Sequence, residues 1–149
     1  MIRLAVVMLG DRGAAEDVVQ DAFSGLYRRW NHLADNSNAL SYVRSAILNR
    51  CRSELRRRIR AEQRAARQAA PPDAASAEAM ALISAEHDAV LRALRSLPPR
   101  QREALVLRFY LDLPETEIAA TMGITPGTVK STTSRGLSAL AQLLREDAQ

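Results

Sequence analysis

The sequence predicts an all-α protein, and three observations lead to this prediction. Aromatic residues make up only 4% of the chain while alanine and leucine are abundant, a composition that favours helices over a sheet. Apolar residues recur at steps of three and four, which is the spacing of a helix with one buried face. No strand pair, hairpin signal or internal repeat interrupts this pattern.

The first half of the chain is expected to begin with two helices. Residues 3–9 are apolar, stop at a glycine-rich break and resemble the tail of a longer helix. Residues 14–30 form an amphipathic helix with the apolar positions Ala15, Val18, Val19, Ala22, Phe23, Leu26 and Trp30. Its opposite, mostly acidic side carries Glu16, Asp17, Gln20, Asp21 and Ser24. Negative charge near a helix N-terminus is favourable through the macrodipole alone, so this side need not be functional.

A third helix is predicted from 39 to about 69, after a polar loop at 31–38. Its inner stripe comprises Leu40, Val43, Ala46, Ile47, Cys51 and Leu55. The same helix contains nine arginines, whose positive charge is offset there only by Glu54 and Glu62. The arginines are Arg44, Arg50, Arg52, Arg56, Arg57, Arg58, Arg60, Arg64 and Arg67. Such a stripe is typical of a surface that faces phosphates, although a solvated helix face has the same composition.

A change in composition marks the expected domain boundary. Two prolines at 71–72 stop the third helix, and PPDAASAEA (71–79) is low in hydrophobicity, as in a flexible linker, which we place at 69–84. The sequence therefore predicts one domain at 1–68 and a second at 85–149.

The second domain is expected to start with two helices separated by the proline pair at 98–99. The first, 87–97, has the apolar residues Val90, Leu91, Leu94 and Leu97. The second, 100–110, is expected to bury Ala104, Leu105, Leu107 and either Phe109 or Leu111.

Two further helices, joined by a tight turn, form the most informative stretch. The first spans about 115–122, and Gly123 after it can adopt the positive φ of a sharp helix stop. Thr125 is a hydroxyl N-cap, and Pro126 occupies the first position of a helix that runs to about 144. This order is typical of a DNA-binding helix-turn-helix.

The faces of the last helix support this interpretation. Its inner side is expected to carry Val129, Thr133, Gly136, Leu137, Leu140, Leu143 and Leu144. Its outer side carries Gly127, Ser131, Ser134, Arg135 and Ser138, with Thr128 and Lys130 at the margins. No carboxylate lies in the helix before Glu146, so hydroxyls and cations can reach phosphates and base edges in a major groove. An ordinary amphipathic helix that ends a small bundle is the alternative.

The sequence contains no recognisable set of catalytic residues. His32 and His87 lack a neighbouring ligand set, and the carboxylates of Glu115 and Glu117 face different sides of a helix. Cys51 is the only thiol, so neither an internal disulfide nor a cysteine-based zinc site can form. No apolar run approaches the ~20 residues that span a membrane, and no signal-peptide layout begins the chain. We therefore expect no cofactor, no metal, no membrane insertion and a cytoplasmic location.

Four segments closely resemble the extracytoplasmic-function sigma factors of the sigma-70 family. They are AEDVVQDAF (15–23), YVRSAILNRCRSELRRR (42–58), LPPRQREALVLRFYLDLPETEIA (97–119) and GITPGTVKSTTSRGLSAL (123–140). They follow the order of the family and cover nearly the whole chain except the linker. The resemblance implies a σ2-like domain and a σ4-like domain that together load core RNA polymerase onto promoters.

The resemblance also implies roles for individual residues. The helix that docks on the β′ clamp helices of the polymerase matches Glu16, Asp17, Gln20, Asp21 and Phe23. The segment that captures a flipped base of the −10 element matches Trp30, Asn36 and Ser37. The helix that follows the −10 DNA matches Asn49, Arg52 and Arg56. The helix that reads the −35 element matches Thr125, Thr128, Lys130, Ser131, Ser134 and Arg135. Further implied partners are the β flap of the polymerase and an anti-sigma factor.

Departures from the family pattern leave two other functions open. The family carries more helix before the position of Met1, Pro114 stands where a capping serine is frequent, and Thr132 stands where a basic residue is frequent. A homodimeric helix-turn-helix repressor would explain 115–144 but would leave the acidic helix and the arginine helix without a task. A sigma-like regulatory module could instead sequester polymerase, or another factor, without initiating transcription.

Overall fold

The computed structural model describes residues 1–33, 36–68 and 85–149, and these described residues contain helices and turns but no strand. The chain divides into two compact units, 1–79 and 80–149, each with its own core. The all-α prediction is confirmed. The expected linker at 69–84 lies outside the described residues. Among the residues described, no helix is long and apolar enough to cross a membrane.

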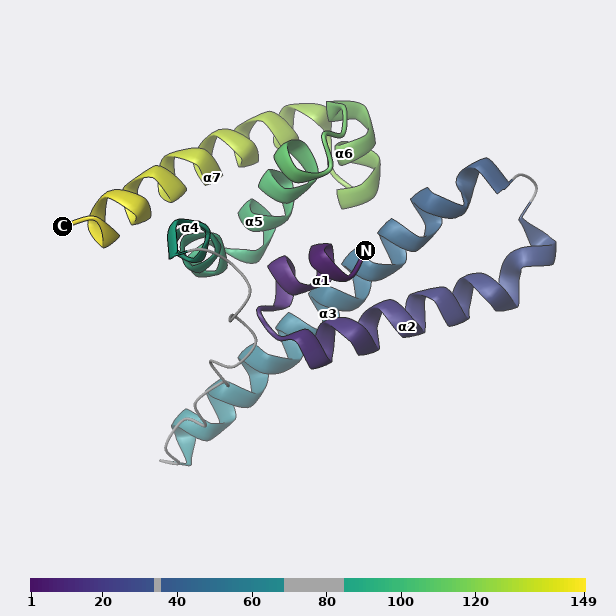
Figure 1. The fold of residues 1–149 in the computed structure, drawn as a ribbon, viewed down its shortest axis with the longest axis horizontal. Helices are drawn as coiled ribbons and strands as arrows, with labels where there is room; N and C mark the ends of the chain where they lie inside the picture. The colour runs from purple at the N-terminus through teal and green to yellow at the C-terminus, as the bar shows by residue number, and fades with distance from the viewer. Residues whose placement is uncertain (34–35, 69–84) are drawn as a thin grey trace. The chain divides into compact units, whose positions relative to one another are not determined.

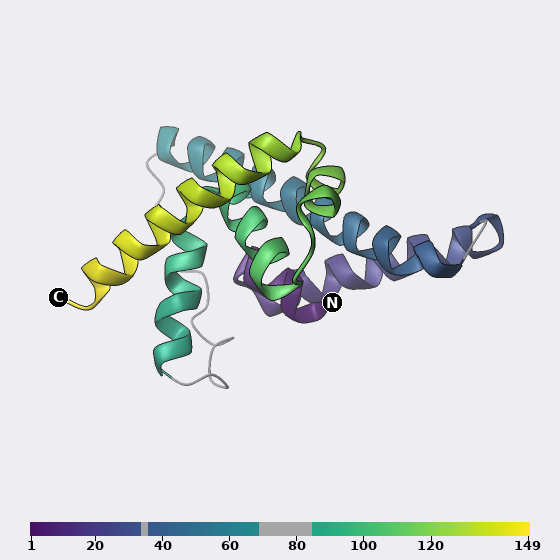
Figure 2. The same cartoon turned by 90° about the horizontal axis from the view of Figure 1, so that it is seen from above.

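The first unit has three α-helices among its described residues. They are α1 (Ile2–Leu9), α2 (Arg12–Arg29) and α3 (Ala39–Arg67), with 3₁₀ turns at Trp30–His32 and Asn36–Asn38. Helices α2 and α3 lie side by side in both views of the fold, and α1 packs against both (Figures 1 and 2). Gly10, at φ 69°, ends α1 and turns the chain, and Asp11 caps α2 by accepting a hydrogen bond of 3.2 Å from the Ala14 amide.

The core of this unit lies where the three helices meet. It is formed by Leu4, Ala5, Met8, Leu9, Ala15, Val18, Val19, Ala22, Leu26, Val43, Ile47, Leu48 and Cys51. Three expected core positions are instead exposed, because α1 covers only the N-terminal part of α2 and leaves the loop end of the α2–α3 pair without a third helix (Figure 1). Leu40 is 57% exposed, and Phe23 and Trp30 are nearly half exposed.

The second unit consists of four helices and one π-helical turn. They are α4 (Ala85–Ser96), α5 (Pro99–Leu105), the π turn Val106–Tyr110, α6 (Glu115–Met122) and α7 (Pro126–Asp147). Helix α7 packs against the other three helices. At Gly136 helix α7 comes close to α5, and a Cβ there would lie 3.2 Å from Cγ of Leu105. A larger residue would therefore require the Leu105 side chain to shift by a few tenths of an ångström.

The π turn corrects the prediction of one regular helix at 100–110. The Leu111 amide donates to the Val106 carbonyl over 3.1 Å, and the Leu113 amide donates to Leu107 over 3.0 Å. These wider turns rotate the following side chains, so Phe109 is 62% exposed rather than buried. The expected burial of Ala104, Leu105 and Leu107 is confirmed.

Two buried charged residues, which a pattern of apolar spacing does not predict, lie in α5. The Arg102 guanidinium donates to the carbonyls of Leu94, Arg95 and Leu97, and thereby caps the C-terminal end of α4. Burial, and secondarily the charge of Arg95, lowers the pKa of Arg102. Glu103 beside it is fully buried and lies 3.4 Å from Arg100.

Candidate nucleic-acid interface

The turn between α6 and α7 has the geometry that the sequence predicts. Gly123 stands at φ 65° and ψ 38°, and the Ile124 amide after it donates to the Ala119 carbonyl over 3.0 Å. The Thr125 hydroxyl accepts from the Thr128 amide over 3.2 Å, which caps α7 at its first turn. The start of α7 is therefore fixed by both a steric stop and a side-chain cap.

All six predicted −35 residues lie exposed on α7 or at its cap. They are Thr125, Thr128, Lys130, Ser131, Ser134 and Arg135. The buried line of α7 instead runs through Val129, Thr132 and Gly136. The expected inward placement of Leu137 is therefore wrong, since this side chain is 43% exposed, whereas Thr132, for which the sequence predicts neither face, is only 9% exposed. The contact of Gly136 with Leu105 sets this rotation, which turns Leu137 to the margin.

Hydrogen bonds link the outer side chains of α7 to one another. The hydroxyls of Thr125 and Thr128 lie 2.9 Å apart, and the Ser131 hydroxyl donates to the Thr128 carbonyl over 3.1 Å. Arg135 donates from Nε to the Ser131 carbonyl over 3.2 Å and from Nη2 to its hydroxyl over 3.3 Å. Since all these groups are exposed, a ligand can replace these bonds at little cost.

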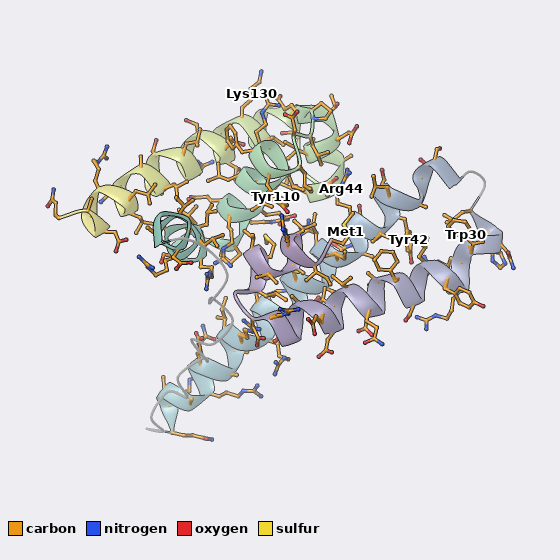
Figure 3. The ribbon with its side chains drawn as sticks, viewed as in Figure 1. Met1, Trp30, Tyr42, Arg44, Tyr110 and Lys130 are labelled. Carbon is orange, nitrogen blue, oxygen red and sulfur yellow. The ribbon has the colours of Figure 1, made fainter. Side chains whose placement is uncertain are left out.

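A shallow groove of about 380 Å³ lies between α6 and α7. Its walls are Arg108, Glu115, Ile118, Val129, Lys130, Thr133, Ser134, Leu137 and Ser138. Lys130 Nζ lies 3.8 Å from a Glu115 carboxylate oxygen, and Figure 3 shows the Lys130 side chain projecting from the helix. The groove therefore combines an apolar floor with charged groups of both signs at its rim.

The polar side of α2 is exposed along its length. Glu16 accepts a 2.8 Å bond from Arg12, and Asp21 lies 4.0 Å from Arg50 Nε on α3. Asp17 and Gln20 are exposed, and Phe23 is 47% exposed between them and the loop end. A groove of about 680 Å³ between α2 and α3 is lined partly by Asp17 and Asp21. This face can offer carboxylates and one aromatic ring to a cationic partner.

The loop end of the first unit gathers aromatic and cationic side chains. Trp30 is 44% exposed there, and the Arg29 guanidinium lies 5.9 Å from the Tyr42 ring centroid (Figure 3). Ser37 is exposed, whereas the side chain of Asn36 lies outside the described residues. Aromatic and guanidinium planes are the groups on which an unpaired base stacks.

The outer face of α3 joins this end to the arginine-rich segment. Arg52 donates to Asn49 Oδ1 over 2.6 Å, and Arg56 donates to the Ser53 hydroxyl over 3.4 Å. The Asn49 and Arg56 side chains are exposed and that of Arg52 is partly exposed. The three predicted −10 residues of α3 therefore share one solvent-facing side.

Two arginines of the expected stripe have structural partners instead. Arg57 and Arg58 both bind Glu54, at 2.8 and 3.0 Å, and Arg58 also donates to the Leu9 carbonyl over 2.7 Å. The hydrogen bond from Arg57, opposed by desolvation and aided by Arg58, lowers the pKa of Glu54 to about 2. The stripe prediction is therefore wrong for Arg58. The spacing of Glu54 from both arginines is the signal that identifies these pairs.

Potential metal ligands do not cluster in the part of the chain that the structure describes. The Cys51 side chain is buried in the core of the first unit.

The described helices and surfaces define a two-part DNA-binding protein with a helix-turn-helix in its second unit. Comparison with known proteins identifies the family. The model of sigma-70 region 2 matches residues 1–61, and that of sigma-70 region 4 matches residues 87–140.

Curated relatives and one solved structure agree with these matches. The chain is 33% identical to the RNA polymerase sigma-E factor of Streptomyces avermitilis over 144 residues, which cover 97% of this chain and 78% of the relative. It is 29% identical to the sigma factor SigM of Mycobacterium tuberculosis, over 87% and 64% of the two chains. The Bartonella quintana sigma factor RpoE, solved with the anti-sigma factor NepR, has a TM-score of 0.78 at 25% identity, over 97% and 89% of the two chains.

The chain belongs to the extracytoplasmic-function sigma factors of the sigma-70 family. It is a sigma factor, which directs core RNA polymerase to promoters at the start of transcription. The resemblance seen in the sequence is thereby confirmed. The family consists of regulators rather than enzymes.

Proposed function

We propose that this sigma factor divides its binding tasks among three surfaces. Helix α2 docks on the β′ clamp helices of core polymerase, the loop end and α3 bind the −10 element, and α7 reads the −35 element. The second unit also contacts the β flap. The protein acts in the cytoplasm, where polymerase and promoter DNA are found.

The main support for this proposal is the outer face of α7, which is suited to reading the −35 element. Thr128, Ser131 and Arg135 are exposed on it, and the helix holds no carboxylate before Glu146. A helix with such a face can enter a major groove without repulsion from phosphates. Thr128 and Ser131 lie in its N-terminal turns, which enter deepest, so we assign base contacts to them and a phosphate contact to Arg135.

At the −10 element, the first unit would trap an unpaired base. The half-exposed Trp30 ring and the Arg29–Tyr42 pair supply stacking surfaces, and the polar loop supplies hydrogen-bonding groups. Asn49, Arg52 and Arg56 would then follow the adjoining backbone. Stacking of one base on an aromatic side chain contributes ~1–3 kcal/mol.

Core binding is assigned to the exposed carboxylates of α2, through charge complementarity with a cationic surface. We expect Asp17→Arg to weaken holoenzyme assembly in a pull-down with core polymerase. Binding of DNA by α7 should be unchanged, because Asp17 lies in the other unit. Gln63→Arg, which adds one positive charge on α3, is the control, and it should assemble normally. Full assembly of the Asp17→Arg protein would remove this surface from the proposal.

We also propose that an anti-sigma factor holds this protein inactive. The support is the Bartonella quintana relative, which was solved in complex with such a partner. The acidic side of α2 and the exposed Phe109 and Tyr110 of the second unit are surfaces that such a partner could cover.

Run-off transcription with reconstituted core polymerase tests the proposal as a whole. The holoenzyme should initiate from a small set of promoters, and the sigma factor alone should bind those promoters weakly. Specific binding as a dimer without core would instead support a repressor. Assembly with core but no initiation from any promoter would support a sequestering module.

A further inference from the structure

Helix α3 continues well past the core of the first unit. It spans Ala39–Arg67, yet its last buried side chain is Cys51. Figure 1 shows its C-terminal part extending beyond the start of α2, where no other helix of this unit covers it. After Arg58, which donates a hydrogen bond to the Leu9 carbonyl of α1, about two and a half helical turns remain, and burial does not explain their composition.

Arginines mark one side of this extension. At 100° per residue, Arg52, Arg56, Arg60, Arg64 and Arg67 fall within a sector of roughly 120°, which also contains Asn49. Glu54 and Glu62 lie outside this sector. The side that begins with the −10 residues of α3 therefore continues without a carboxylate to the end of the helix.

The last three arginines are also available to a ligand. Arg60, Arg64 and Arg67 are exposed, and none of them forms an ion pair with another described residue. Arg57 and Arg58 on the same helix instead both form ion pairs with Glu54. The contrast separates two structural arginines from three that remain free to bind anions.

We propose that Arg60, Arg64 and Arg67 bind backbone phosphates of the duplex DNA immediately upstream of the −10 element. This inference rests on the proposed −10 role of α3. Along the chain α3 is followed by the second unit, whose proposed target lies further upstream, and we therefore place the DNA next to the end of α3 in the promoter spacer. The match to sigma-70 region 2 ends at residue 61, and Arg64 and Arg67 therefore lie beyond it.

The dimensions suit a phosphate contact. From Arg52 to Arg67 the helix rises about 22 Å at 1.5 Å per residue. This length corresponds to about six base pairs at 3.4 Å each. Contacts of this kind position the DNA without reading its sequence, so they should contribute affinity that depends on salt and not on spacer sequence.

The test uses the full-length triple variant Arg60→Gln/Arg64→Gln/Arg67→Gln, assembled with core polymerase. Glutamine preserves helix propensity, and circular dichroism checks that α3 is intact. Promoter affinity is measured between 50 and 200 mM salt. Each lost phosphate contact reduces the slope of log affinity against log salt by ~0.9, so we expect a reduction of about 2 to 3.

Two controls isolate the spacer contact. Arg57→Gln removes one arginine from the same helix whose charge is already paired, and it should leave the slope unchanged. A DNA probe that carries the −10 element but ends before the spacer should bind the triple variant and the wild type equally.

Three results would overturn the inference. An unchanged slope for the triple variant would show that the three arginines do not meet phosphates, while the proposed function would stand. An equal loss on the truncated probe would move their role to the −10 element or to core assembly. A wild-type holoenzyme that binds no promoter would overturn the proposed function and this inference together.

Discussion

Arg135 illustrates how the outer face of α7 is prepared for DNA. Its guanidinium is held by Ser131, whose own hydroxyl donates to the Thr128 carbonyl. These bonds orient the arginine along the helix while leaving it exposed. Phosphate oxygens can replace the Ser131 acceptors without leaving a buried group unsatisfied.

We expect Arg135→Ala to fold normally, since surface changes of this kind usually alter stability by no more than ~0.5 kcal/mol. Promoter affinity should fall evenly across single-base variants of the −35 element, and the salt slope should fall by about one. Titration of both holoenzymes against such variants at two salt concentrations measures this. A loss of ~1–3 kcal/mol confined to one position would instead identify a base contact.

At single positions, the sequence predicts what depends on neighbours along the chain. The Thr125 cap and the positive φ of Gly123 are local features, and both predictions are confirmed. The burial of Thr132 and the exposure of Leu137 depend on how α7 is rotated against α5. The spacing of apolar residues within α7 does not determine this rotation. The burial of Arg102 likewise depends on other elements, because its acceptors are the carbonyls of Leu94, Arg95 and Leu97 at the C-terminal end of α4 and just after it.

Among the elements, Arg58 joins all three helices of the first unit. It extends from α3 to the last carbonyl of α1, lies 3.7 Å from Asp11 at the cap of α2, and binds Glu54 of its own helix. Its side chain is only 30% exposed, so these interactions are partly shielded from water. One arginine therefore fixes the α1–α2 corner against α3.

We expect Arg58→Met to destabilise the first unit by roughly 1–3 kcal/mol, because it leaves the Leu9 carbonyl and one side of Glu54 without their charged donor. Arg60→Met, two residues on and exposed, is the matched control and should change stability by less than ~0.5 kcal/mol. Trp30 is the only tryptophan, so denaturation followed by its fluorescence reports on this unit. Equal stability of the two variants would show that the corner does not depend on Arg58.

The positions of the helices along the chain could be predicted from the sequence far better than the packing of the helices against one another. The boundaries of α2, α3, α6 and α7 lie within a few residues of those expected, since caps, glycines and apolar spacing define them locally. The π turn at Val106–Tyr110 could not be predicted, because its wider bonds leave no mark on a pattern of apolar spacing. The exposure of Phe109, Trp30 and Leu40 follows from which neighbouring helices are present.

On the scale of the whole molecule, the two units are distinct in both contacts and family match. Each unit has its own core, and the matches to sigma-70 region 2 and region 4 fall in different units. A chain built in this way can place two DNA-binding surfaces on separate promoter elements. Of the residues between the two matches, 62–67 complete α3 and include Arg64 and Arg67 of the proposed spacer contact.

We expect limited proteolysis of the full-length protein to cut first within 69–84 and to give two fragments that remain helical. The segment has two prolines and many small residues, so little of its surface could be buried in a core. It contains no lysine or arginine, which makes trypsin unsuitable, whereas an elastase cleaves after the small residues that it does contain. Mass spectrometry of the first products locates the cut, and circular dichroism of each purified fragment reports its helix content. A first cut inside 14–30 would mean that the first unit opens more readily than the connection, and the two units could then not be treated as independently stable domains.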